Sequence, residues 1–349
     1  MRIIGTTREA GNKSAYILTL LMLIGLLGFA FLSLAAEGEW TRKADMPTPR
    51  WCLGTAVVDG IIYAIGGGGA GTKAVEAYDL IADTWIQKTR MPTGRGELST
   101  SVVKGKIYAI GGTQPIAGPF PTVEEYDPVI DTWAKKTDMP TPRSALCTSV
   151  VNGIIYAIGG YVHNSTLSKV EAYDPATDTW TEKADMPAAR RYFSTSVVNG
   201  IIYAIGGAGN SIQGLPTVDA YDPKTDTWTR KADMPTARSG LATSVVDGIV
   251  YAFGGTPFHP TAISTVEAYD PLTDTWTEKA DMPMARNDPS SSAVGGRIYV
   301  IGGITGNIDR IFQTVEEYTP EGWPFSSVSP RGKLPTTWGE RRMRSRHGL

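Results

Sequence analysis

Short apolar segments recur along the chain at a nearly constant interval, and each ends in a pair of glycines. The run Gly-Ile-Ile-Tyr-Ala-Ile-Gly-Gly at 153–160 is repeated at 60–67 and 200–207. A segment this short, apolar and without alternation is typical of a strand covered on both faces. The repetition predicts six units of about 47 residues. The glycine pairs stand at 66–67, 111–112, 159–160, 206–207, 254–255 and 302–303.

Each unit divides into four pieces with the composition of strands. In the third unit these are the run from Arg143 to Val151, the run 154–158, a piece around 170–173 and one around Trp180. Four such strands form one antiparallel sheet, or blade. Because the apolar strands need cover on both faces, the blades are expected to pack against one another and close into a ring.

Tryptophans mark the outer strand of each unit. Seven candidates are present for six units, at positions 40, 85, 133, 180, 228, 276 and 323. Trp40 stands in Glu-Trp-Thr-Arg-Lys-Ala-Asp-Met-Pro, which matches the other outer strands, whereas Trp323 lacks the preceding Asp-x-Thr-Asp turn. Residues 39–43 are therefore predicted to supply the outer strand of the sixth blade and to join the first blade to the last.

These residues resemble the kelch motif, in which an Arg follows Met-Pro, a Tyr precedes Gly-Gly, and Tyr-Asp-Pro is followed by a Trp. The match covers residues 39–320 and recurs six times. The resemblance implies an all-β fold: a six-bladed kelch-type β-propeller with four antiparallel strands per blade, here preceded by one N-terminal hydrophobic helix. The predicted boundaries are 1–36 for the N-terminal segment, 37–325 for the propeller and 326–349 for a basic, disordered tail.

The N-terminal segment differs sharply from the repeats. Residues 15–36 carry no charge, and a helix of this length spans roughly 33 Å, enough to cross a bilayer core of about 30 Å. Arg2, Arg8 and Lys13 precede it, which favours a cytoplasmic N-terminus and export of the rest. Approximate small-residue cleavage sites at its end leave a cleaved signal peptide and a retained transmembrane anchor both open. Either predicts an extracytoplasmic propeller: periplasmic, secreted or membrane-anchored.

The loops between the second and third strands differ from unit to unit. Antiparallel order places them on one face, together with the connections between blades. A constant frame carrying variable loops is a common arrangement for recognition, although drift in unconstrained loops gives the same variation. The six loops are 68–73, 113–121, 161–168, 208–216, 256–264 and 304–313.

An arginine recurs four residues after a Met in every unit, at the predicted start of the innermost strand. In some kelch proteins, arginines near this place bind acidic peptides, and paired hydrogen bonds suit guanidinium groups to carboxylates. Six-fold placement would make a ring of guanidinium groups around the channel mouth, and the resemblance implies that such a ring binds acidic peptides. A scaffold role, with each Arg bonded to backbone or to an acid of the next blade, is also open. The six are Arg50, Arg95, Arg143, Arg190, Arg238 and Arg286.

The residues directly after these arginines vary, which marks them as candidates for ligand contact. Two positions after the Arg, alternation along a strand would turn the side chain toward the channel. That prediction selects Glu97, Tyr192 and Asp288, with Trp51 and Arg191 flanking them. Acids, an Arg and aromatic rings in a concave mouth would suit a peptide or a sugar.

Charge and missing motifs narrow the function further. Without the basic residues of the two ends, the body carries about nine more acidic than basic side chains, which argues against a nucleic-acid partner. The three His and two Cys, Cys52 and Cys147, form no zinc motif or nucleophile arrangement, so no metal, cofactor or catalytic residue is predicted. The sequence favours a module that binds a protein or peptide over an enzyme. A glycan-binding propeller and a sugar mutarotase, using Glu97 or Asp288 with Arg191, are the alternatives.

Overall fold

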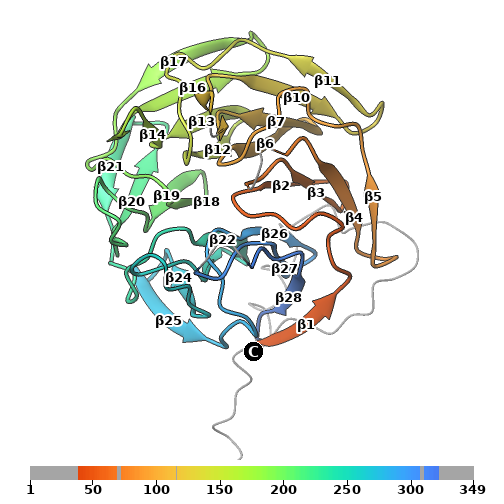
Figure 1. The fold of residues 1–349 in the computed structure, drawn as a ribbon. Helices are drawn as coiled ribbons and strands as arrows, with labels where there is room; N and C mark the ends of the chain where they lie inside the picture. The colour runs from red at the N-terminus through yellow and green to blue at the C-terminus, as the bar shows by residue number, and fades with distance from the viewer. Residues whose placement is uncertain (1–37, 69–71, 115, 307–309, 322–349) are drawn as a thin grey trace, which may run out of the picture. The chain divides into compact units, whose positions relative to one another are not determined.

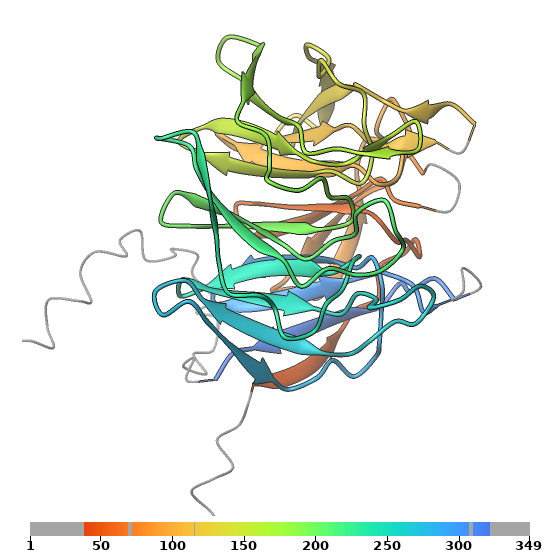
Figure 2. The same cartoon turned by 90° about the vertical axis from the view of Figure 1, so that its left-hand side faces the viewer.

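The computed structural model describes residues 38–321, apart from 69–71, 115 and 307–309. These residues form a six-bladed β-propeller, in which six four-stranded antiparallel sheets surround a central axis (Figure 1). The same ring is seen from the side in Figure 2. The predicted number of blades and the number of strands in each are confirmed.

Two predicted segments lie outside the described residues. These are the hydrophobic helix at 15–36 and the basic tail at 326–349. Among the residues that are described, no helix has the length and apolar character needed to span a bilayer. Export and membrane attachment therefore stay predictions.

The strands of each blade follow one another from the axis outward. The innermost strands are β2 (Gly54–Val58), β6 (Ser99–Val103), β12 (Cys147–Val151), β18 (Ser194–Val198), β22 (Ala242–Val246) and β26 (Ser290–Val294). The second strands are β3 (Ile61–Ile65), β7 (Lys106–Ile110), β13 (Ile154–Ile158), β19 (Ile201–Ile205), β23 (Ile249–Phe253) and β27 (Arg297–Ile301). The third strands are β4 (Val75–Asp79), β10 (Val123–Asp127), β16 (Val170–Asp174), β20 (Val218–Asp222), β24 (Val266–Asp270) and β28 (Val315–Thr319). The outermost strands are β5 (Thr84–Gln87), β11 (Thr132–Lys135), β17 (Thr179–Lys183), β21 (Thr227–Arg230), β25 (Thr275–Lys279) and β1 (Glu39–Lys43).

The N-terminal strand closes the ring, as predicted. Strand β1 pairs antiparallel with β28, with Trp40 opposite Tyr318, and so becomes the outer strand of the sixth blade. The Trp40 indole N–H donates to the carbonyl of Ala280 in the fifth blade at 3.0 Å, and its ring lies 5.9 Å from that of Phe253. The first and last blades are therefore joined by backbone pairing, and the outer edge of β28 in the sixth sheet is covered by β1.

The core lies between adjacent blades. In one cluster, Ile65 and Val75 of the first blade pack against Ile107 and Ala109 of the second, and comparable clusters fill the other interfaces. The second strands are buried along both faces, which is why their sequences are apolar without alternation. Each blade therefore needs its neighbours for cover.

The glycine pairs allow one blade to dock on the next. At the first pair, Gly66 has a φ of 60°, and a Cβ there would lie 2.6 Å from the carbonyl oxygen of Arg95. The N–H of Gly67 donates to that same oxygen at 3.1 Å. A side chain at Gly66 would both strain the backbone and break this contact. The glycines therefore hold the arginine-bearing segments at a fixed place near the axis.

Candidate functional site

The six recurrent arginines are buried in the blades and do not form an exposed ring. Each has no exposed surface and makes an ion pair with an acid on the third strand of its own blade. The predicted guanidinium ring at the channel mouth is therefore wrong, and so is the expectation that an acid of the next blade would be the partner. The pairs are Arg50–Glu76, Arg95–Glu124, Arg143–Glu171, Arg190–Asp219, Arg238–Glu267 and Arg286–Glu316.

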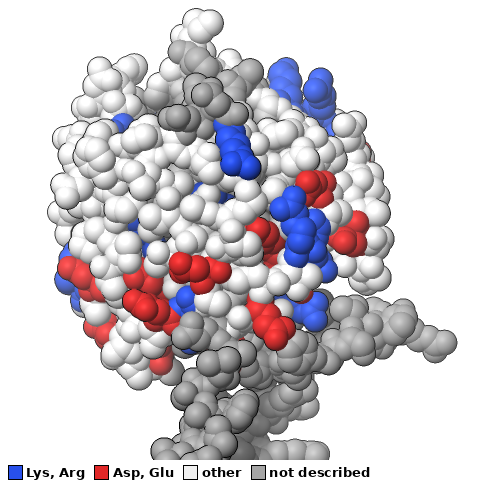
Figure 3. All heavy atoms as spheres, turned by 60° about the horizontal axis from the view of Figure 1, so that its bottom comes forward, with Lys and Arg blue, Asp and Glu red and all other residues white. Residues whose placement is uncertain are grey.

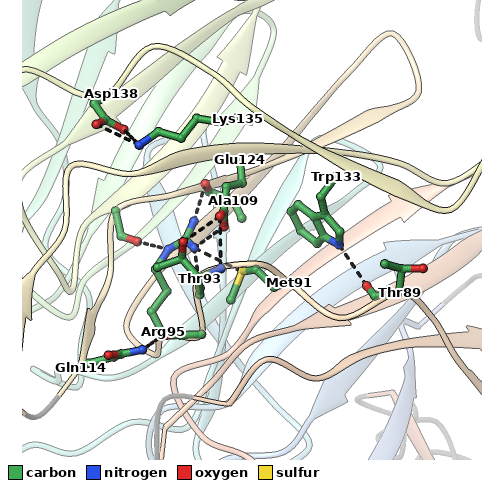
Figure 4. A network of polar contacts seen from close by, with 12 residues as sticks. Thr89, Met91, Thr93, Arg95, Ala109, Gln114, Glu124, Trp133, Lys135 and Asp138 are labelled. Atoms are coloured by element: carbon green, nitrogen blue, oxygen red, sulfur yellow. Dashed lines mark hydrogen bonds and ion pairs between the residues drawn. The ribbon is translucent and has the colours of Figure 1, made fainter.

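Figure 4 shows the arrangement around Arg95. Its guanidinium donates to Glu124 at 2.5 Å and to the carbonyl oxygens of Ala109 and Gly111 at 2.8 and 2.6 Å. One side chain thus connects the segment before the innermost strand to the second and third strands. Burial lowers the pKa of Arg143 and of Arg238 to about 10, so both keep their charge at neutral pH. These arginines hold the scaffold together.

The residues two positions after each arginine form a closed ring of backbone hydrogen bonds. All six have left-handed backbone conformations, with φ between 47° and 62°. The N–H of each donates to the carbonyl of its counterpart in the preceding blade, over 2.7 to 3.1 Å, and the N–H of the first donates to the last. The ring residues are Cys52, Glu97, Ala145, Tyr192, Gly240 and Asp288.

A cavity of about 100 Å³ lies at the centre of this ring. Its walls are the six ring residues and the residue that follows each of them. The predicted convergence of Glu97, Tyr192 and Asp288 is therefore confirmed, although the reason given for it was wrong. These residues precede the innermost strands, so the left-handed backbone directs their side chains, and strand alternation does not.

Two acids, Glu97 and Asp288, line the cavity, and each accepts a hydrogen bond from a neighbouring side chain. The Tyr192 hydroxyl donates to Glu97 at 2.8 Å, and the Asn287 amide donates to Asp288 at 3.0 Å. Asp288 is 9% exposed. Burial, followed by the negative charge of Glu97, raises the pKa of Asp288 to about 7, although a hydrogen bond from Cys52 opposes the change. Asp288 can therefore gain or lose a proton near neutral pH.

The neighbouring thiol and phenol stay protonated at neutral pH. Burial raises the pKa of Cys52 well above its ordinary value, and the charge of Asp288 adds to this. Burial likewise raises the pKa of Tyr192, with Glu97 the next contributor. Because a thiol must ionise to act as a nucleophile or metal ligand, Cys52 is a hydrogen-bond donor here. Both Cys52 and Cys147 are free thiols.

Asp288 is expected to make the stability of the propeller depend on pH. Since its folded-state pKa is raised, the folded protein holds this proton at pH values where the unfolded chain has released it. Lowering the pH from 8 to 6 should therefore increase the free energy of unfolding by about 1 kcal/mol through this group. Urea unfolding of wild type and D288N at both pH values measures the difference between them. Identical pH responses of the two proteins would contradict the prediction.

Trp51 and Arg191 stand beside the cavity and do not line it. Trp51 packs under the first loop, where a Cβ on Gly68 would lie 2.4 Å from the indole ring. The Arg191 guanidinium lies 4.3 Å above the ring of Tyr161 and 5.8 Å from that of Tyr192. Neither side chain makes an ion pair or hydrogen bond with Glu97 or Asp288 in the described part of the chain.

The second to fifth loops between second and third strands are linked to one another and form a rim beside the cavity mouth. Two loops carry hairpins of their own: β8 (Thr113–Gln114) with β9 (Gly118–Pro119), and β14 (Tyr161–Val162) with β15 (Ser165–Thr166). The first and second hairpins contact each other through β9 and β14. The third loop bonds to the fourth through Thr166 and Asn210, and the fourth to the fifth through Gly214 and Pro257. The rim is thus a supported surface.

Large apolar side chains are exposed on this rim. Ile116, Ile212 and Phe258 come from three different loops, and each exposes more than half of its surface. On the side of the molecule shown in Figure 3, much of the surface is uncharged, and acidic and basic side chains occur together. A partner meeting the rim can therefore gain from apolar contact.

Sequence reasoning missed two features of this site. One is Asn287, which orients Asp288 and gives no signal in a single sequence. The other is the pairing of arginines with acids, for which a signal exists, since an acid recurs at the second position of every third strand. Six arginines and six acids at constant positions indicate a structural pair.

Comparison with known proteins agrees with this architecture. A model of the kelch motif matches residues 49–92, 94–140, 237–283 and 285–330, and a model of the KLHDC2/KLHL20/DRC7 Kelch-repeats domain matches residues 126–255. A solved structure titled "Structure of YjhT" is similar, with a TM-score of 0.70 and 16% sequence identity; the match covers 78% of this chain and 96% of that one. At this identity the likeness extends to the fold alone. No match was found among curated proteins.

Proposed function

The chain belongs to the kelch-repeat family, and we propose that it is a binding module that recognises a protein or peptide through the loop face of its propeller. We further propose that it works on the extracytoplasmic side of a membrane, to which the apolar segment at 15–36 directs or tethers it. The scaffold supports such a role, because buried ion pairs and blade packing keep the six loops in fixed positions.

The observation that carries this proposal is the rim with its exposed apolar side chains. Ile116, Ile212 and Phe258 project from loops that are linked to neighbouring loops by hydrogen bonds or by hairpin contact, so little additional chain has to be ordered on binding. Removal of apolar surface from water is the main favourable contribution to most protein–protein association. Because the arginines are buried, an acidic peptide would find no guanidinium ring here.

A second candidate function is a sugar site in the central cavity, as a glycan-binding propeller or a mutarotase. Asp288 favours it, because a carboxyl group with a pKa of about 7 can exchange protons with a sugar at neutral pH. The cavity volume of about 100 Å³ supports it less, since pockets for drug-sized ligands commonly measure about 300–1,000 Å³. An anomerisation assay by NMR with free sugars separates this candidate from the first.

The test of the proposed function compares two faces of the same propeller. A variant carrying Ile116→Ser, Ile212→Ser and Phe258→Ser is expected to bind its partner at least about tenfold more weakly than wild type. The partner is identified by crosslinking in cell-envelope extract, purified, and its affinity measured by calorimetry.

The control variant removes exposed apolar side chains from the turns between third and fourth strands. These turns lie at the ends of the third strands opposite to the rim loops. Ile81→Ser, Val129→Ser and Leu272→Ser together should leave the affinity within about twofold of wild type. Equal losses in both variants, or none in the first, would reject the loop face as the binding surface.

A further inference from the structure

The central cavity contains two carboxyl groups, those of Glu97 and Asp288, that have no basic partner among the described residues. Among the described residues, every other buried carboxyl group has a basic partner: the six third-strand acids pair with arginines, and Glu317 pairs with Lys43 and Arg297. Asp288 is 9% exposed and has no such partner, and neither has Glu97. Since a buried charge without a counter-charge is costly, the arrangement points to a cation supplied from outside.

An unpaired acceptor lies at the same place. The side chain of Asn287 is 7% exposed; its amide nitrogen donates to Asp288, but its oxygen Oδ1 has no hydrogen-bond partner. That oxygen lies 2.0 Å from the position a Cβ on Gly240 would occupy. In the ring, the other five side chains at this position line the cavity. Oδ1 therefore stands close to where the sixth side chain would begin, beside Gly240 in the cavity wall.

Three acceptor groups thus lie at this place: the carboxylates of Glu97 and Asp288 line the cavity, and the amide oxygen of Asn287 lies beside Gly240 in its wall. An oxygen of Asp288 also lies near Gly240, 2.5 Å from the same Cβ position. A primary ammonium group has three N–H donors and one positive charge, and therefore matches this set. Its narrow methylene stem also suits a cavity of about 100 Å³.

We propose that the central cavity binds a primary ammonium group, delivered by a lysine side chain of the protein partner. This inference rests on the proposed function, because the cavity opens within the loop rim that would hold the partner. The lysine would reach the axis while the rest of the partner contacts Ile116, Ile212 and Phe258. The cavity would then select a basic residue of the partner, whereas a ring of arginines would select an acidic one.

The pocket is tested by calorimetric titration of the full-length chain with Nα-acetyl-lysine methylamide, its Nε-acetylated form and n-butylamine. The lysine derivative should bind, the acetylated form should not, and E97Q or D288N should weaken binding at least about tenfold. E278Q is the matched control, since Glu278 is an exposed acid on the outer strand β25, and it should leave binding within about twofold. Binding of wild type should tighten as the pH rises from 6 to 8, because Asp288 then ionises. The groups around Asp288 are Glu97, Cys52 and Tyr192.

The source of the ammonium group is tested with a lysine-containing partner peptide and its norleucine counterpart. If the lysine peptide binds more tightly than n-butylamine, the result supports a partner lysine as the source of the ammonium group. Equal affinities would assign the pocket to a free amine and reject the partner lysine as the source. Absence of lysine-derivative binding, or binding unaffected by E97Q and D288N, overturns the pocket. Thermal melting of both variants excludes misfolding as the cause of a loss. Failure here, with partner binding still lost in the rim variant, would leave the proposed function standing.

Discussion

Replacing Arg143 with alanine is expected to lower the free energy of unfolding by about 3–5 kcal/mol. The guanidinium is completely buried, and its removal leaves the carboxylate of Glu171 inside the blade without a counter-charge. The carbonyl oxygens of Ala157 and Lys169 lose a donor at 3.1 and 2.9 Å as well. Urea unfolding followed by circular dichroism measures the change.

A surface lysine provides the control. Lys135 is 61% exposed, and its ion pair with Asp138 lies at the surface, so K135A should change the free energy of unfolding by at most about 1 kcal/mol. Adding E171Q to R143A should recover part of the lost stability, because it neutralises the stranded carboxylate. Wild-type stability of R143A would show that the buried pair does not support the scaffold.

Deleting residues 37–45 is expected to lower the melting temperature by at least about 10 °C. The deletion removes strand β1, which pairs along the whole of β28 and adds backbone pairing to the packing between the first and sixth blades. It also removes Trp40, whose ring packs on Phe253 and whose N–H is bonded to Ala280. The sixth blade would be left with three strands and an open edge.

Deletion of an equally long segment at the other end, residues 341–349, is the control for chain shortening and should leave the melting temperature unchanged. Differential scanning calorimetry of the three proteins gives the comparison. A transition unaffected by loss of 37–45 would mean that β1 contributes nothing to ring closure, contrary to its register with β28.

The arginines illustrate how a repeat can be recognised correctly and its residues still be misplaced. Their constancy from blade to blade is compatible with an exposed ring and with a buried scaffold, and guanidinium chemistry serves both. The constant acid on each third strand favoured the buried pair, but it lies between 26 and 30 residues along the chain from its arginine. Only the folding of three strands into one sheet brings the two together.

The axial residues show the converse. Their variability marked Glu97, Tyr192 and Asp288 as candidates, and the structure brings them together at one cavity. Their shared left-handed conformation and the hydrogen bonds between neighbouring blades give no sequence signal, because residues as different as Cys52 and Gly240 adopt it. That they bind a ligand stays a prediction.

By itself, the amino-acid sequence determined the architecture: six units, four strands in each, and an N-terminal strand that completes the last blade. It could do so because spacing and apolar pattern are local, and a strand apolar on both faces must be covered by its neighbours. The tertiary structure alone decided which charges are buried in pairs and which meet unpaired at the axis. Those outcomes depend on groups that lie far apart in the chain and approach one another only when all six blades surround one centre. There, burial and the charge of Glu97 together raise the pKa of Asp288.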